Sequence, residues 1–134
     1  MAFPENHAPS DLIIFLVDDD PLTLSLYTKV LRGEGFFTMA VSSASDALEM
    51  IDRGLTKVNL IITDINMPGL DGVRFYQKVK ARRPDLAHKI IFISGGVFSG
   101  EMAALLESLP NPKLKKPFET ERFLEVVGFV STLK

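Results

Sequence analysis

The sequence predicts an α/β domain in which a doubly wound, five-stranded parallel sheet is covered by five helices. Three observations support this fold class. Short apolar runs alternate with longer segments of helical periodicity, turn residues separate them, and the 134 residues are enough for one ordinary domain but not for two. Strands that alternate with helices in this way form a parallel sheet with helices on both faces.

Five short apolar runs are the predicted strands. The first of them is apolar, branched and short, which is typical of a strand buried on both faces. In chain order the predicted strands cover residues 12–17, 36–41, 58–63, 89–93 and 113–115. Lys113 and Lys115 in the last strand are expected to be solvated charges that protect a sheet edge from further pairing.

The helices between these strands are predicted from capping residues and breakers. Asp20 and Pro21 begin the first helix, because Asp accepts free amide hydrogens at an N-cap and Pro suits the first helical position. Ser43 begins the second helix, with Asp46 three residues later, and Thr120 is expected to cap the last one. The third and fourth helices are expected at residues 73–81 and 101–109. Apolar side chains recur at four-residue steps in the first helix: Leu22, Leu26 and Val30.

Composition excludes several classes of function. The chain is 46% hydrophobic and 24% charged with a formal net charge of −2, and its basic residues are scattered, so no nucleic-acid partner is expected for this domain. It contains no cysteine, which excludes disulfides, thiol catalysis and cysteine-based zinc sites. No apolar run is long enough to span a bilayer, and the polar segment 1–10 lacks the features of a signal peptide. We expect a flexible lead-in over 1–10, a domain over 11–134, a cytoplasmic location and no membrane partner.

Polar side chains follow the predicted strands where each strand ends. Asp18–Asp20, Asp64, Ser94 and Lys116 should meet at one edge of the sheet, because parallel strands end on the same side. Ligands of open α/β sheets bind outside these carboxyl ends. Asp64 close to Asp18 and Asp19 would be penalised unless one carboxyl is protonated or a cation compensates. Hard cations such as Mg²⁺ take oxygen ligands, so the sequence predicts a magnesium site.

Mg²⁺ and Lys116 together would neutralise an incoming phosphoryl group on two sides. Phosphoryl transfer depends mostly on positioning and electrostatic stabilisation, and carboxylates are suitable nucleophiles for it. The hydroxyl of Ser94 could then donate to a phosphoryl oxygen. Since Ser94 precedes two glycines, the loop beyond it could move when that bond forms, which would make the site a switch.

Four motifs stand in order at the strand ends: "FLVDDDP", "IITDINMPGLDG", "IIFIS" and "LKKPF". Together they resemble the receiver domain of two-component response regulators, over nearly the whole chain from Asp11. The resemblance implies a flavodoxin-like sheet of order 2-1-3-4-5, with Asp64 as phosphoacceptor and Ser94 and Lys116 at the switch and lysine positions. It also implies the ligands of Mg²⁺: Asp18, Asp19, Asp64 and the backbone carbonyl of Asn66.

The resemblance also implies partners. A sensor histidine kinase or a histidine phosphotransfer protein would supply the phosphoryl group, the output domain or target is unknown, and a homodimer is possible. The segment "ESLPNPKLKKPF" is similar to receivers of hybrid sensor histidine kinases, but a stand-alone or transcription-factor receiver is equally compatible. The chain departs from the family at Lys113, where receivers often carry an aromatic residue whose rotamer reports phosphorylation. How the signal leaves the site therefore stays open.

Two other functions fit some of these residues. Asp18 and Asp20 are separated by one residue and follow the first predicted strand, which is similar to the nucleophile motif of haloacid-dehalogenase-like phosphatases. In such an enzyme Asp18 would be the nucleophile. A phosphorylation-independent docking module is the second alternative. The position of the phosphoryl group, on Asp64, on Asp18 or on neither, separates the three hypotheses. A receiver is a signalling phosphoacceptor that assists its own phosphorylation and dephosphorylation, so we do not expect an enzyme acting on other substrates.

Overall fold

The structure is a computed structural model that describes residues 13–54, 57–96, 98 and 100–133. The predicted lead-in, residues 1–10, and the predicted domain boundary at residue 11 lie outside the described residues.

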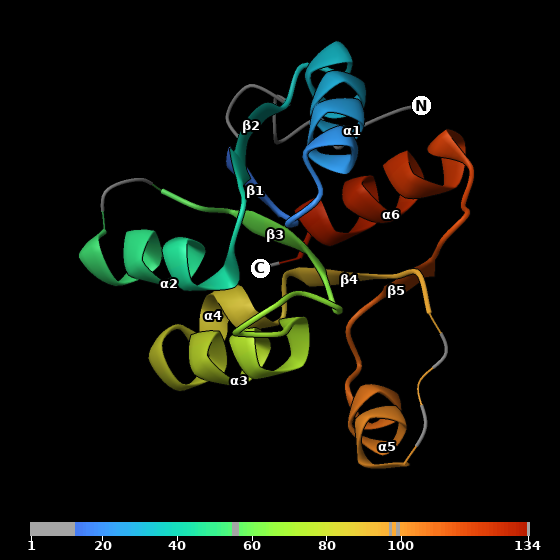
Figure 1. The fold of residues 1–134 in the computed structure, drawn as a ribbon. Coiled ribbons are helices and arrows are strands. Elements are labelled where there is room, and N and C mark those ends of the chain that lie inside the picture. The colour runs from blue at the N-terminus through green and yellow to red at the C-terminus, as the bar shows by residue number, and fades with distance from the viewer. Residues whose placement is uncertain (1–12, 55–56, 97, 99, 134) are drawn as a thin grey trace.

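The described strands form one parallel sheet in the order β2-β1-β3-β4-β5 (Figure 1). The predicted fold class and strand order are therefore confirmed. The boundaries lie within two residues of the predicted ones: β1 Ile13–Val17, β2 Phe37–Val41, β3 Leu60–Asp64, β4 Ile90–Ser94 and β5 Lys113–Lys115. Asp64 and Ser94 are thus the last residues of their strands and not the first residues beyond them.

Six helices, one more than predicted, lie in the described part of the chain: α1 Pro21–Gly33, α2 Ala44–Arg53, α3 Gly72–Arg82, α4 Pro84–Ala87, α5 Gly100–Ser108 and α6 Thr120–Ser131. The additional helix is α4. "RRPD" ends α3 as expected, but Pro84 then occupies the first position of a new turn, where its fixed φ is favourable.

Two predicted N-caps are confirmed and one is wrong. The side chain of Asp20 accepts a hydrogen bond from the backbone N–H of Leu22, and that of Ser43 accepts one from Asp46. Thr120, however, is the first residue within α6, and the N-cap residue is Glu119, whose side chain makes no capping hydrogen bond.

The helices cover both faces of the sheet. α1 and α6 lie on one face, and α2, α3 and α4 lie on the other, where α5 sits at the β5 end (Figure 1). Alternate residues of β1 point into the two resulting cores: Ile14 and Leu16 pack on the α1 and α6 side, and Phe15 and Val17 pack on the α2 and α3 side. All four are completely or almost completely buried, so β1 is a central strand fixed on both faces.

The four-residue stripe in α1 is not the buried face of that helix. Leu22 and Leu26 are 79% and 57% exposed. Of the three stripe residues, Val30 packs on the core, together with Leu24, Tyr27 and Leu31. Steps of four drift around a helix of 3.6 residues per turn, so a stripe of this spacing alone does not identify the buried face.

None of the described helices combines the length and the hydropathy that are needed to cross a bilayer.

Candidate functional site

Three carboxylates converge at the carboxyl ends of β1 and β3. Asp18 follows β1 directly, and its backbone N–H donates to the carbonyl of Val41 at 3.1 Å, which extends the pairing with β2 by one residue. Asp64 ends the neighbouring strand β3. One carboxylate oxygen from each of Asp18, Asp19 and Asp64 lies within 4.8 Å of the other two. The parallel register, in which Val17 pairs with Thr63, brings these residues together.

The cluster is largely shielded from water. Asp18 is 2% exposed and Asp64 is 9% exposed, whereas Asp19 is open to solvent. Burial raises the pKa of Asp18 to about 6, and the negative charges of Asp64 and Asp19 add to this effect; the backbone N–H of Asp20 and the charge of Lys116 oppose it. A buried carboxylate beside two others is therefore under-compensated by this chain alone. The all-oxygen donor set and its excess negative charge fit a hard divalent cation such as Mg²⁺.

Lys116 reaches the cluster from β5. Its Nζ lies 3.7 Å from Oδ2 of Asp18 and 3.7 Å from Oδ2 of Asp64. The backbone N–H of Lys116 donates to the carbonyl of Ser94 at 2.7 Å, and the lysine stem passes beside Gly95, where a Cβ would lie 3.6 Å from Cδ of Lys116 in ordinary contact. The single cation is thus shared between the two buried acids.

Ser94 and Asn66 border the cluster in different ways. Ile93 pairs with Asp64, so Ser94 emerges next to the acid, but its hydroxyl donates to the carbonyl of Gly96 at 3.2 Å. The backbone N–H of Asn66 donates to Oδ1 of Asp64 at 3.1 Å and holds one carboxylate oxygen in place. The six predicted site residues thus lie at or just beyond the ends of β1, β3, β4 and β5, and their roles stay predictions; the Ser94 hydroxyl is bonded to the carbonyl of Gly96.

Asp71 and Gly72 set the start of α3 next to the end of β3. Asp71 is the N-cap of α3 and accepts from the backbone N–H of Arg74 at 2.9 Å. A Cβ at Gly72 would lie 2.4 Å from the carbonyl oxygen of Asp64 and 2.8 Å from Cα of Ile65. Gly72 therefore lets α3 begin directly against the end of β3. The signal was available, because Asp before a helical periodicity is a typical N-cap.

Lys113 is also not simply solvated. Its Nζ donates to the carbonyl of Leu109 at 2.6 Å and to that of Asn111 at 2.9 Å. The residue that stands in place of the family's frequent aromatic thus ties β5 to the chain that leaves α5.

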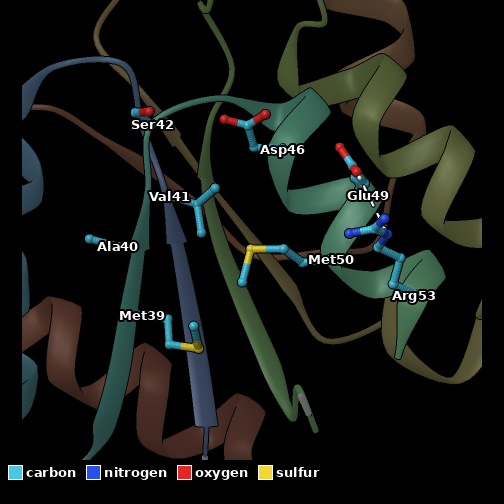
Figure 2. Close-up of a pocket in the computed structure, with 8 residues that line it drawn as sticks. All are labelled: Met39, Ala40, Val41, Ser42, Asp46, Glu49, Met50 and Arg53. Atoms are coloured by element: carbon cyan, nitrogen blue, oxygen red, sulfur yellow. Dashed lines mark ion pairs between the residues drawn. The ribbon is translucent and has the colours of Figure 1, made fainter. Parts of the chain in front are cut away.

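A surface depression of about 370 Å³ lies between β2 and α2, away from the acidic cluster (Figure 2). Figure 2 shows Met39 and Met50 turned into it and Glu49 paired with Arg53, an exposed ion pair of 3.7 Å. No residue of the acidic cluster lines this depression, and it presents no convergent set of buried polar groups.

Comparisons with known proteins agree with this geometry. The family model of the response regulator receiver domain matches residues 14–128. The chain is 29% identical over 111 residues to the DNA-binding response regulator MtrA of Mycolicibacterium smegmatis, covering 83% of this chain and 46% of that protein. It is 28% identical over 107 residues to the sensor histidine kinase RcsC of Escherichia coli, covering 80% of this chain and 11% of that protein. The chain thus spans less than half the length of either relative.

A solved structure supports the same family by both its fold and its sequence. A response regulator receiver protein from Sinorhizobium medicae superimposes with a TM-score of 0.76 at 26% identity, covering 90% of this chain and 94% of that chain. Domains of this kind are signalling phosphoacceptors in two-component systems and imply a histidine kinase partner. With its acidic pocket of Asp18, Asp19 and Asp64, the chain belongs to the family of response regulator receiver domains.

Proposed function

We propose that this chain accepts a phosphoryl group on Asp64 from the phosphohistidine of a sensor histidine kinase or a histidine phosphotransfer protein. Asp18, Asp19 and Asp64 would hold Mg²⁺ together with the backbone carbonyl of Asn66. The observation that carries the proposal is the position of Lys116, whose Nζ lies 3.7 Å from both Asp18 and Asp64 beside a three-carboxylate cluster. The Lys116 amine together with a metal ion neutralises a phosphoryl group better than the metal ion alone, because the amine adds a further positive charge.

Phosphoryl transfer to Asp64 would exchange one bond to phosphorus for another. A carboxylate oxygen of Asp64 forms a bond to phosphorus while the bond between phosphorus and the donor nitrogen breaks. The nitrogen keeps the electron pair, and the donor histidine leaves as a neutral imidazole because its other ring nitrogen carries a proton. Lys116 would pair with a phosphoryl oxygen, and Mg²⁺ held by Asp18, Asp19 and Asp64 would supply further neutralising charge. The N–H of Asn66 orients the attacking carboxylate through its hydrogen bond to Oδ1.

The same step would switch the domain. The Ser94 hydroxyl donates to Gly96 in the present structure. Once phosphoryl oxygens stand beside Asp64, they offer charged acceptors, which form stronger hydrogen bonds than a neutral carbonyl does. Transfer of the Ser94 hydrogen bond to the phosphoryl group would release Gly96 and shift the chain that leads to α5. This is the proposed route from chemistry to conformation.

The test is phosphorylation by acetyl phosphate in the presence of Mg²⁺. We expect the intact mass to rise by about 80 Da, the mass of one phosphoryl group, because only one carboxylate is phosphorylated. Asp64→Asn should abolish the gain. Asp71→Asn is the matched control, because Asp71 caps α3 outside the cluster and Asn is an equally good cap; this variant should still be phosphorylated.

Other outcomes would overturn the proposal. A mass gain that persists in Asp64→Asn and maps to Asp18 would favour the phosphatase hypothesis. An unmodified wild-type chain that nevertheless binds a partner would favour the docking module. A gain that disappears in Asp71→Asn as well would show that the measurement reports folding and not the acceptor.

A further inference from the structure

A three-ring aromatic cluster stands beside the acidic site. Tyr27 of α1 stacks on Phe118 with ring centroids 5.5 Å apart and an interplanar angle of 22°. Phe123 of α6 closes the cluster, 5.1 Å from Tyr27 and 5.6 Å from Phe118. Tyr27 thereby connects the first helix to the chain between β5 and α6, and such ring contacts stabilise beyond the burial of their area.

One of these rings, Phe118, lies two residues after Lys116. The connection from Lys116 to α6 has few other anchors among its described residues: Pro117 and Glu119 are exposed, and Glu119 at the N-cap makes no side-chain capping hydrogen bond. Phe118 is the side chain of this connection that packs against the core. The direction in which the chain leaves Lys116 therefore depends on how Phe118 is held.

Lys116 itself is held at its backbone N–H. Its N–H is bonded to the carbonyl of Ser94, but its side chain is long, flexible and 28% exposed. A lysine ammonium on a four-carbon stem has no preferred direction of its own. The 3.7 Å distances to Asp18 and Asp64 thus depend on the backbone on both sides of the residue.

We propose that Tyr27 is a positioning residue for Lys116: its ring holds Phe118, and through Phe118 it keeps the lysine ammonium between Asp18 and Asp64. The inference rests on the proposed function, because the role of Tyr27 is to place the lysine amine where a phosphoryl group would arrive. Burial raises the pKa of the Tyr27 phenol, and the charges of Lys116, Asp18 and Asp64 also act on it, which agrees with a ring close to the site. Because the stack uses the ring, the hydroxyl is dispensable.

The test compares phosphorylation rates with acetyl phosphate and Mg²⁺ in two variants of Tyr27. Tyr27→Leu removes the ring and should lower the rate constant about tenfold, well short of the ~10²-fold that a 1 Å misplacement can cost. Tyr27→Phe keeps the ring and should retain the wild-type rate. Mg²⁺ affinity, measured by calorimetric titration, should stay within about twofold in both variants, because the carboxylates that hold the ion are untouched.

A matched control separates positioning from stability. Tyr76 packs on Phe92 with centroids 5.8 Å apart, on the face of the sheet opposite to α1 and α6. Tyr76→Leu should lower the melting temperature yet leave the phosphorylation rate unchanged at a temperature where every variant is folded. A rate that falls equally in Tyr76→Leu and Tyr27→Leu would overturn the inference.

A double-mutant cycle tests the route through the lysine. If Tyr27 acts through Lys116, Tyr27→Leu should cause no further loss of rate in a Lys116→Ala background. Independent, multiplicative losses would overturn the inference, and so would an unchanged rate in Tyr27→Leu alone. If the wild-type chain is not phosphorylated at all, the proposed function fails. In that case a crystal structure of Tyr27→Leu still tests the positioning, because Lys116 Nζ should leave its place between the two acids.

Discussion

The two halves of the site are built differently. The acids stand on β1 and β3, which are central strands paired on both sides and covered by helices on both faces. Ser94 and Lys116 stand toward the sheet edge, where β5 has three residues and only Leu114 is buried. Beside it, α5 buries only Leu106 among its residues, whereas α6 buries seven of its twelve.

This difference indicates which half is able to move. Shifting Asp18 or Asp64 would disturb two hydrophobic cores at once, and close-packed interiors resist small displacements. The described residues between β4 and α5, which are Gly95, Gly96 and Phe98, are exposed or half-buried, so moving them would disturb few buried contacts. Regions of low local stability are those that open or rearrange most readily. The acidic half of the site, on β1 and β3, is therefore suited to hold a metal ion and an acceptor in place. The edge half, with Ser94 and Lys116, is suited to change conformation.

The largest expected effect is that of a substitution at Gly72, where α3 begins against the end of β3 in the acidic half of the site. In Gly72→Ala the new Cβ would meet backbone atoms of Asp64 and Ile65 at 2.4 and 2.8 Å, and neither can move aside without shifting β3 or α3. We expect a loss of about 3 kcal/mol in the free energy of unfolding, the upper range for overpacking, measured by urea unfolding. Gly33→Ala is the control, because a Cβ there has no atom within 4 Å. Equal stability of the two variants would contradict the close approach of α3 to β3.

An intermediate effect is expected from the buried charge of Asp18. Its pKa in the folded chain is about 6, above the ordinary value of 3.8, so folding is penalised increasingly as pH rises through this interval and fully above it. In metal-free solution at about pH 7, Asp18→Asn should therefore raise the free energy of unfolding by about 1–3 kcal/mol, since one pKa unit corresponds to about 1.4 kcal/mol.

Asp18→Asn should also remove the pH dependence of stability that Asp18 causes and weaken the binding of Mg²⁺. The gain in stability should disappear below about pH 4, where Asp18 is protonated in both states, and Mg²⁺ binding should weaken strongly because a carboxylate ligand is gone. Unfolding measured in a chelator at both pH values checks the first point, and calorimetry checks the second. If Asp18→Asn is no more stable than the wild type at neutral pH, the buried charge of Asp18 does not destabilise the folded chain.

The smallest effect is expected in the adjustable half, at Ser94. Ser94→Ala removes one hydrogen bond of 3.2 Å to Gly96 from a partly exposed loop, so stability should change by less than about 1 kcal/mol. Phosphorylation of Asp64 should continue, but the change in amide hydrogen exchange that it causes in α5 should shrink, with β1 and β3 as internal references. A full exchange response in α5 without the hydroxyl would show that the signal leaves by another route.

Much of the fold and the site could be predicted because it depends on local patterns. Apolar runs and helical periodicity indicated the alternation of elements, and parallel strands end at one edge, so Asp18, Asp64 and Lys116 had to meet there. The caps at Asp20 and Ser43 were equally local, since each side chain bonds a backbone N–H two or three residues away.

Other features were decided only when distant segments packed together. The buried face of α1 depends on where α6 and the sheet lie, so Leu22 is exposed while Leu31 is buried. The need for Gly72 arises from the approach of α3 to the end of β3. The stack of Tyr27 on Phe118 joins residues that are far apart in the chain. Periodicity and spacing describe neighbours along the chain, whereas these contacts depend on the distances between elements, which only the packed core sets.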